Sequence, residues 1–347
     1  MCPKATGTGI LYAQVSLPLK GTTTMKAHQF ESAASGLRLL DLPDPTAGEG
    51  QVLIRVEAAG MCQSDVHIIN GHGDAWLRQR PIVLGHEVAG TVMQLGPGVS
   101  EVAVGDRVAV ALISHPASEA DFADGIGLGF DGGYAEFAAV PVRNLVPVPD
   151  GVPFTHAAVA TDSIATAYHA VATEAAISEG SVVAVIGLGG LGLNAVRIAS
   201  LLGATVHGID IDPGTFAAAA EQGAYRCHAG IDDIEGEIDI VLDFAGVGTS
   251  TADAISAVRQ GGRIVLVGLG VQEATLPTGL LITKNIQLRG SLGASVEELQ
   301  AVLGLLADGT LEPVVEEVDF RDLESALRRL ERGDVRGRLV TRPNAYR

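Results

Sequence analysis

The sequence contains few cysteines. Its 347 residues include three, Cys2, Cys62 and Cys227, an odd number at wide spacing. Such a set does not form the disulfide framework of a small secreted protein, and it favours a reducing compartment such as the cytoplasm. A cysteine in that compartment stays available as a metal ligand or packs as a small apolar side chain.

Basic residues are scarce relative to acidic ones. The chain has 23 lysines and arginines against 41 aspartates and glutamates, which gives a formal net charge of -18 at pH 7. A surface of this charge repels phosphate backbones. We therefore expect no nucleic-acid partner.

Long hydrophobic runs are missing. The longest apolar stretch, 182–193, is interrupted by glycines and is shorter than the roughly 20 apolar residues that span a bilayer. Residues 1–24 lack the compact charged, apolar and cleavage regions of a signal peptide. We expect no membrane association, and we interpret residues 1–24 as an N-terminal extension outside the fold.

The length of the chain suits two domains, because a single hydrophobic core stops growing at roughly 250–300 residues. From residue 25 to about 149, short β-type runs alternate with glycine and proline, which predicts an irregular, mostly antiparallel β domain. Within it, 114–133 is polar, rich in glycine and free of cysteine, and we interpret it as a surface loop. Two helical stretches and a strand after residue 295 are expected to rejoin this domain.

Between these parts the pattern changes to alternating helix and strand. A helical stretch at 155–175 precedes strand candidates at 182–186, 205–209, 225–228, 238–243, 263–268 and 286–290. Two triplets of strands separated by helices predict a doubly wound parallel sheet of the Rossmann type, and the fold class is α/β.

The first of these strands ends in a glycine-rich turn, Gly-Leu-Gly-Gly-Leu-Gly at 187–192, that opens a helix. In a dinucleotide site Gly187 would allow the tight turn, Gly189 would let the backbone approach the pyrophosphate, and Gly192 would allow close packing of strand and helix. Gly190 and Leu191 begin the helix, whose N-terminus would face the phosphates. A merely structural glycine turn is the alternative.

Asp210 ends the next strand, close to the ~20-residue offset of an acid that binds the ribose. Its carboxylate would accept hydrogen bonds from a 2′-hydroxyl and repel a 2′-phosphate, and no lysine or arginine occurs at 209–216. The sequence therefore predicts NAD rather than NADP. Asp212 is the competing acid, although it could instead cap a helix that begins at Pro213, and Asp210 could be a solvated strand end.

Cys62 and His86 form half of a candidate metal site. Thiolate and imidazole are first-choice zinc ligands, and both residues lie among glycines within 60–90. Taken singly, Cys62 could be a buried small apolar residue and His86 a hydrogen-bonded core histidine. Their proximity in the sequence favours a shared ion with a third ligand from elsewhere.

Five motifs follow one another along the chain: GMCQSD at 60–65, GHEVAG at 85–90, GDRVAV at 105–110, GGYAEF at 132–137 and the glycine turn. With these motifs the chain resembles the zinc-dependent alcohol dehydrogenases of the medium-chain dehydrogenase/reductase superfamily. The resemblance implies a β-rich, GroES-like catalytic domain at 25–162 and 293–347 and a Rossmann NAD-binding domain at 163–292. It also implies a homodimer or homotetramer.

The resemblance further implies a catalytic zinc held by Cys62, His86 and a third ligand from the segment that leads into the cofactor domain. Many relatives have cysteine there, whereas this chain has Asp162, and a carboxylate is an accepted zinc ligand. Glu87, expected beside the metal rather than on it, and His156, expected to pack or cap a helix, are rival third ligands. Because 114–133 lacks the four cysteines that bind a structural zinc in many relatives, we predict one zinc per chain.

In the family, the proton of the alcohol leaves along a hydroxyl, the nicotinamide ribose and a histidine. The matching residues are Ser64 and His67, which could instead be a turn-stabilising hydroxyl and a surface histidine. Asp65 would orient His86 by accepting its second ring N–H.

The resemblance also implies cofactor contacts beyond the glycine turn. It places Thr166 and the backbone of Gly268, Leu269 and Ser291 near the nicotinamide. Arg338 would lie near the pyrophosphate, and its alternative is an exposed strand arginine. Gln63 stands where some relatives have an arginine on that phosphate.

The resulting hypothesis is reversible hydride transfer between a primary or secondary alcohol and NAD, giving an aldehyde or ketone, with zinc acidifying the alcohol or polarising the carbonyl group. A polyol or sugar dehydrogenase and a ketone reductase with the same site are alternatives. From another class, the alternative is a non-catalytic nucleotide-binding or redox-sensing protein. We expect the walls of the substrate pocket around Trp76, in 114–130 and at the edge of the cofactor domain.

Overall fold

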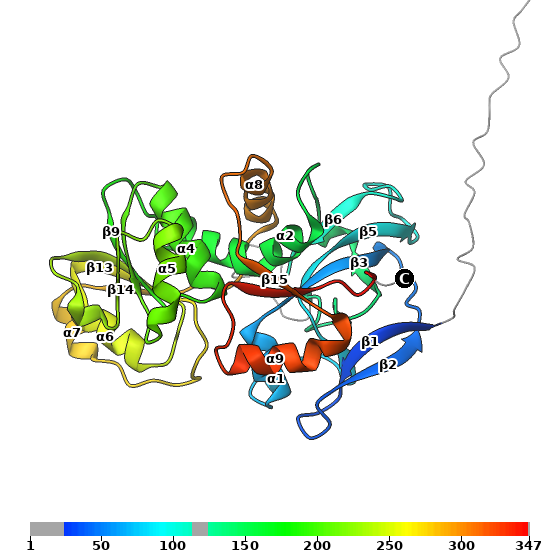
Figure 1. Cartoon of the computed structure of the whole chain (residues 1–347), viewed down its shortest axis with the longest axis horizontal. Coiled ribbons are helices and arrows are strands. Elements are labelled where there is room, and N and C mark those ends of the chain that lie inside the picture. Colours follow the sequence, from blue (N-terminus) through cyan, green and yellow to red (C-terminus); the bar gives the residue numbers. More distant parts are fainter. Residues whose placement is uncertain (1–23, 113–123, 346–347) are drawn as a thin grey trace, which may run out of the picture.

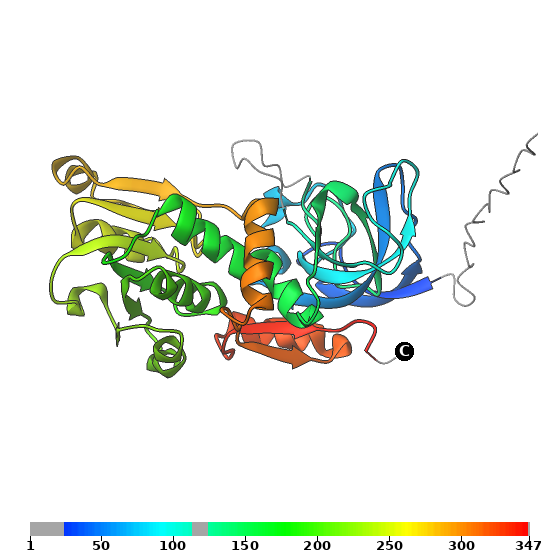
Figure 2. The same ribbon diagram turned by 90° about the horizontal axis from the view of Figure 1, so that it is seen from above.

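A computed structural model describes residues 24–112 and 124–345. Two lobes lie side by side, one built on a parallel sheet and the other rich in antiparallel strands (Figure 1). Seen from above, helix α8 (Val296–Ala307) crosses the helical segment that runs between the lobes (Figure 2). The predicted extension at 1–24 falls almost wholly outside the described residues.

The first lobe contains the predicted doubly wound sheet. Its six strands have the order β11-β10-β9-β12-β13-β14, and every neighbouring pair is parallel. This is the order of a Rossmann sheet, which confirms the predicted fold class. The strands are β9 (Val182–Ile186), β10 (Thr205–Ile209), β11 (Arg226–His228), β12 (Ile238–Asp243), β13 (Val258–Leu266) and β14 (Gln287–Gly290).

Strand β9 is apolar throughout because both of its faces are covered. Val183 and Val185 pack in a core with helix α4 (Gly190–Leu201), whereas Ala184 and Ile186 pack in a second core with helix α6 (Thr249–Ala257). Successive side chains of a strand point to opposite faces, so a continuous apolar run is what a doubly covered parallel strand requires. The other helices of this lobe are α5 (Phe216–Glu221) and α7 (Thr278–Thr283).

The second lobe is built mostly on antiparallel strands, as the sequence predicts for its N-terminal part, and only β15 and β16 pair in parallel among its described strands. A seven-stranded sheet has the order β15-β16-β3-β5-β6-β8, with β7 paired to β3, and a three-stranded sheet has the order β2-β1-β4. The C-terminal strand β16 pairs with β3, so the end of the described chain lies in this sheet. The exact domain boundaries stay a prediction. The strands are β1 (Thr24–Phe30), β2 (Leu37–Pro43), β3 (Gln51–Met61), β4 (Ile82–Val83), β5 (Glu87–Leu95), β6 (Arg107–Val110), β7 (Phe137–Pro141), β8 (Leu145–Pro147), β15 (Val315–Val318) and β16 (Arg338–Thr341).

The helical segment between the lobes is not the single regular helix expected at 155–175. Two short α-helices, α2 (Phe154–Val159) and α3 (Ala165–Tyr168), alternate with two π-helical segments, η5 (Ala160–Ile164) and η6 (His169–Glu174). Each π turn places an additional residue in the helix and changes the direction of the side chains after it. Outside this segment, α1 (Gln63–Ile69) lies beside α9 (Leu323–Glu331) in the β-rich lobe (Figure 1).

The surface-loop interpretation of 114–133 is wrong for the part that the structure describes. Ile126 and Leu128 are 0% and 4% exposed and belong to the core of the β-rich lobe. Their apolar side chains alternate with glycines, which made the stretch look like a loop although it packs inward. Of the described helices, none is long and apolar enough to cross a membrane.

Candidate functional site

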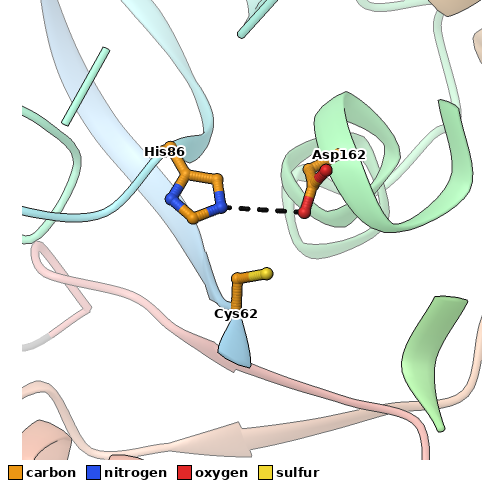
Figure 3. Close-up of side chains that lie close together, drawn as sticks. All are labelled: Cys62, His86 and Asp162. Carbon is orange, nitrogen blue, oxygen red and sulfur yellow. Dashed lines mark ion pairs between the residues drawn. The ribbon is translucent and has the colours of Figure 1, made fainter. Parts of the chain in front are cut away.

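The structure brings three candidate metal ligands together between the lobes (Figure 3). Cys62 is the N-cap of α1, His86 directly precedes β5, and Asp162 lies in η5. All three are buried, and one ligand atom from each lies within 4.8 Å of the others. Nε2 of His86 is 3.6 Å from Oδ2 of Asp162.

The π segment explains how Asp162 reaches this position. It stands in the middle of η5, in a helix whose other residues at 157–167 are buried. π turns are rare, are less stable than α turns and are frequent at functional sites, where they direct a side chain out of the regular helical pattern. The sequence pointed to Asp162 through the family position but gave no sign of the π turn.

Asp65 supports the two ligands of the β-rich lobe. As the third residue of α1 it accepts a hydrogen bond from the backbone N–H of Cys62 at 3.0 Å, and its Oδ1 lies 3.4 Å from Nδ1 of His86. Tyr134 donates its hydroxyl to Oδ2 of Asp65 at 2.7 Å. The motif that contains Tyr134 was recognised in the sequence, but a role for its hydroxyl was not predicted, because nothing local marks a tyrosine 69 residues away as a partner of Asp65.

The electrostatics of the site favour a cation at its centre. Burial alone would lower the pKa of His86, but the carboxylates of Asp65 and Asp162 outweigh burial and raise that pKa well above its usual value. Burial would raise the pKa of Asp162, and His86 and Arg338 hold it well below its usual value instead. A site that stabilises positive charge so strongly suits a metal dication.

Glu87 and Arg338 form a buried ion pair next to the ligands. Arg338 donates from Nε to Oε1 of Glu87 at 3.0 Å, and its Nη2 donates to Oε1 of Glu87 at 2.5 Å and to Oδ2 of Asp162 at 2.9 Å. Arg338 is 4% exposed, so the alternative of an exposed strand arginine is wrong. Its Nη1 approaches Gly190 in the glycine turn, and contact with a pyrophosphate stays a prediction.

Glu87 and His156, the two rival third ligands, do not lie with Cys62 and His86 in the candidate metal-ligand group. Glu87 is held by Arg338 and by the backbone N–H of Ser163 at 3.0 Å, and it is not among the residues that converge. His156 is half-buried on α2, where burial lowers its pKa. Within residues 24–112 and 124–345, Cys62, His86 and Asp162 are the side chains that meet as a metal-ligand group.

These residues fit a zinc ion chemically. One thiolate, one imidazole and one carboxylate are all accepted zinc ligands, and three protein ligands leave the open position that a catalytic zinc needs. Arg338 is paired with Glu87, whereas Asp65 lies beside His86, so Asp65, Asp162 and a thiolate at Cys62 leave an excess of negative charge that a dication would offset.

Ser64 and His67 both lie on α1, but they have different neighbours. The hydroxyl of Ser64 is 3.3 Å from the sulfur of Cys62, and Ser64 lines the cavity beside the metal ligands. His67 is in the last turn of α1, near the rings of His72 and Trp76, and burial lowers its pKa. A proton path between Ser64 and His67 stays a prediction.

The glycine turn has the shape that a dinucleotide needs. Gly187 has φ +88°, a conformation that other residues rarely adopt, and a Cβ on Gly192 would lie 1.8 Å from the carbonyl oxygen of Gly187. A Cβ on Gly189 would meet nothing within 4 Å, so space is open above the turn at the N-terminus of α4.

Asp210 stands directly after β10 and contacts the glycine turn. It accepts the backbone N–H groups of Leu188 at 2.8 Å and of Asp212 at 2.9 Å. Asp212 accepts the backbone N–H of Gly214 and so caps the short helix at Pro213, as its alternative interpretation predicted.

One cavity connects the metal ligands with the residues predicted to contact the nicotinamide. Its volume is about 100 Å³, and it is lined by Cys62, His86 and Asp162 together with Thr166, Leu269 and Ser291. The buried hydroxyl of Ser291 has no hydrogen-bond partner within the described residues, so it is available to a ligand. Gly268, which was also predicted near the nicotinamide, packs against the backbone of Phe244 and Ala245 and is not among the residues that line this cavity. The apolar walls are Trp76, Leu112, Leu128, Leu191, Val267 and Leu292.

Known proteins resemble this chain across both lobes. Residues 48–150 match the family model described as "Alcohol dehydrogenase GroES-like domain", and residues 190–308 match "Zinc-binding dehydrogenase". An alcohol dehydrogenase of Geobacillus stearothermophilus is 28% identical over 91% of this chain and 98% of its own length. An L-threonine 3-dehydrogenase of Streptomyces coelicolor is 31% identical over 87% of this chain and 95% of its own. The solved structure of acetophenone reductase from Geotrichum candidum in complex with NAD is 34% identical with a TM-score of 0.85, covering 93% of this chain and 98% of that one.

Proposed function

The chain belongs to the zinc-type alcohol dehydrogenases of the medium-chain dehydrogenase/reductase superfamily, and we propose that it transfers a hydride reversibly between an apolar alcohol and NAD. Membership makes it an oxidoreductase of alcohols in general. The proposal adds the cofactor, the metal ligands and the class of substrate.

The proposal rests on one observation: the same cavity is lined by the candidate metal ligands and by residues predicted to contact the nicotinamide. The metal-ligand group Cys62, His86 and Asp162 and the unpartnered hydroxyl of Ser291 line the same space. A substrate oxygen near the three ligands would therefore have its carbon within reach of a nicotinamide held against Ser291 and Leu269. A non-catalytic nucleotide-binding protein has no need for this arrangement of buried, metal-competent side chains.

Zinc at this position would polarise the oxygen of an alcohol or carbonyl substrate and lower the pKa of the alcohol. The protein's own residues would do the rest. Asp65, fixed by Tyr134, would hold the imidazole of His86 in one orientation. The hydroxyl of Ser64 would accept the proton of the alcohol as it releases its own proton toward His67, which would exchange a proton with solvent.

The walls of the cavity favour apolar substrates. Among the described wall residues, Leu112, Leu128 and Leu292 carry no hydrogen-bonding side-chain group and Trp76 carries only its indole N–H, which favours an apolar substrate over a polyol or sugar. The related acetophenone reductase acts on an apolar ketone by its name, so aryl ketones and secondary aryl alcohols belong in the first substrate panel. Threonine should be included because an L-threonine 3-dehydrogenase is also a relative.

The first test measures metal content and turnover together. We expect the purified, dialysed protein to contain one zinc per chain and to reduce NAD with apolar secondary alcohols, followed by NADH absorbance. Two zincs per chain would contradict the predicted stoichiometry. A zinc-free protein that turns over at full rate would contradict the site itself.

A matched pair of variants distinguishes loss of a zinc ligand from a non-specific effect of replacing a cysteine with serine. Cys62→Ser removes the thiolate ligand and should abolish both zinc retention and turnover while NAD binding remains. Cys227→Ser makes the same chemical change on β11, away from the cavity, and should leave zinc and turnover unchanged. Equal activity in both variants would overturn the proposal. We also propose a homodimer or homotetramer, which light scattering tests.

A further inference from the structure

The two carboxylate oxygens of Asp162 have different partners. Thr166 donates its hydroxyl to Oδ1 at 2.7 Å. Oδ2 accepts a hydrogen bond from Arg338 at 2.9 Å and lies 3.6 Å from Nε2 of His86. Asp162 and Thr166 are 7% and 5% exposed, so water does not compete freely for either oxygen.

This asymmetry matters because an aspartate is a less defined ligand than a cysteine. A carboxylate has two equivalent oxygens, rotates about the bond that carries it and can bind a metal through one oxygen or both. Binding through both would occupy the open position that a catalytic zinc keeps for its substrate. A thiolate has one ligand atom and needs no such restraint.

We propose that Thr166 is a positioning residue for Asp162: its hydroxyl holds Oδ1, so that Asp162 offers Oδ2 alone to the metal. The inference rests on the proposed zinc site and goes beyond the expected contact of Thr166 with the nicotinamide. The bond joins residues four apart, from the π segment η5 to helix α3, and the helix therefore fixes its geometry. Arg338 restrains the carboxylate from the other side.

The experiment measures zinc affinity in the full-length protein without NAD or substrate. Zinc is removed with a chelator and returned in competition with an indicator of known affinity. Thr166→Val keeps the shape of the side chain and removes the hydroxyl, and we expect zinc to bind about 10-fold to 100-fold more weakly, as is typical when a ligand loses its hydrogen-bond partner. Thr166→Ser keeps the hydroxyl and should restore affinity close to that of the wild type.

The same substitution in a second variant, Asp162→Cys, tests why Thr166→Val should weaken zinc binding. In Asp162→Cys, the ligand resembles that of many relatives and has no second oxygen to hold. Thr166→Val should then leave zinc affinity unchanged. The visible absorption of the Co²⁺-substituted proteins gives an independent readout, because it depends on the number of ligands: Thr166→Val should add a ligand in the aspartate background and not in the cysteine background.

The outcomes distinguish this inference from the function on which it rests. If Asp162→Asn binds zinc as tightly as the wild type, the proposed metal site is wrong. If Asp162→Asn loses zinc but Thr166→Val keeps wild-type affinity and an unchanged Co²⁺ spectrum, the site stands and the role of Thr166 is overturned. An equal loss on Thr166→Val in both backgrounds would also overturn it, and a melting temperature for each variant identifies loss through unfolding.

Discussion

Arg338 is the residue that links the candidate metal ligands to the glycine turn. Its side chain pairs with Glu87 and Asp162, and Nη1 approaches Gly190. Glu87 and Arg338 are 251 residues apart in the chain, so no local pattern could reveal their ion pair. Removing one partner of a buried pair leaves an uncompensated charge, which costs more than the pair itself contributes.

Replacing Arg338 with leucine should therefore be strongly destabilising. We expect Arg338→Leu to lower the free energy of unfolding by about 3–5 kcal/mol, measured by urea denaturation of the zinc-free protein. Arg336→Leu is the matched control, because Arg336 pairs with Asp212 at the surface with both side chains about half exposed. The control should cost less than about 1 kcal/mol. Similar losses in the two variants would contradict the importance of the buried pair.

At the scale of single elements, two substitutions in the glycine turn should affect protein stability and NAD binding differently. A Cβ on Gly192 would collide with the carbonyl oxygen of Gly187, whereas one on Gly189 would meet open space in the described structure. We expect Gly192→Ala to lower protein stability by about 1–3 kcal/mol, as overpacking does, and to weaken NAD binding. Gly189→Ala should leave stability unchanged and weaken NAD binding alone, by crowding the pyrophosphate.

Thermal denaturation and NAD titration by fluorescence measure the two effects separately. The interpretation fails if Gly189→Ala binds NAD as well as the wild type, because the open space above the turn would then have no part in binding. It also fails if Gly192→Ala is fully stable.

Two segments connect the lobes, one containing η6 and the other containing α8. A hydrogen bond between η6 and α8 joins them. Nδ1 of His169 lies 2.9 Å from the carboxylate of Glu298, which also accepts the hydroxyl of Thr173 and the backbone N–H of Ser295. On the other side of the ring, Glu174 lies 3.5 Å from Nε2 and also pairs with Arg289. Burial alone would lower the pKa of His169, but the two glutamates raise it, and the pKa of Glu298 falls to about 2 although burial opposes that shift.

This cluster should make stability depend on pH in a defined window. The raised pKa of His169 means that its contribution is complete below pH 6.5 and is lost as the pH rises through the folded value. The lowered pKa of Glu298 means that its contribution is complete above pH 4.5 and is lost as the pH falls toward 2. Between pH 4.5 and 6.5 both contributions are present.

His169→Gln should therefore cost about 1.5–3 kcal/mol of unfolding free energy near pH 5.5 and clearly less at pH 9. Urea denaturation at both pH values measures the difference. The control is His156→Gln, because burial lowers the pKa of His156 and its neutral form is the favoured one. A cost for His169→Gln that is the same at both pH values would show that the ion pair does not contribute.

The sequence predicted the regular elements well and the irregular ones poorly. Strand β9 has the predicted ends because an apolar run before a glycine turn is a strong local signal. The π segments around Asp162 and His169 were missed, since one additional residue in a helix leaves no mark in an apolar, alanine-rich stretch. Leu128 was assigned to a surface loop because glycine-rich segments suggest turns, and only tertiary packing shows that it enters the core and lines the cavity.

On the scale of the whole molecule, residues distant in sequence meet where the lobes face each other. Asp162 joins Cys62 and His86 there, and Arg336 approaches Asp212 across 124 residues of sequence. The argument for NAD used the absence of lysine and arginine at 209–216. The structure corrects that argument, because Arg336 brings a positive charge to this loop from the other end of the chain.

The preference for NAD or NADP should then depend on which acidic groups pair with the guanidinium of Arg336. In the wild type Asp212 pairs with it at 2.9 Å, and Asp210 directs its carboxylate to the same loop, so a 2′-phosphate would meet two acids. We expect the wild type to prefer NAD. Asp210→Ser together with Asp212→Ser removes both acids and frees Arg336 for a charge-assisted hydrogen bond to the phosphate.

The double variant should shift the ratio of kcat/KM for NAD and NADP toward NADP by about 10-fold or more, since a hydrogen bond to a charged group contributes about 1.5–3 kcal/mol. Adding Arg336→Ala should reverse most of the gain, because the positive charge would be gone while both acids remain absent. If the triple variant uses NADP as well as the double variant does, Arg336 does not reach the phosphate, and repulsion by Asp210 and Asp212 alone explains the preference for NAD.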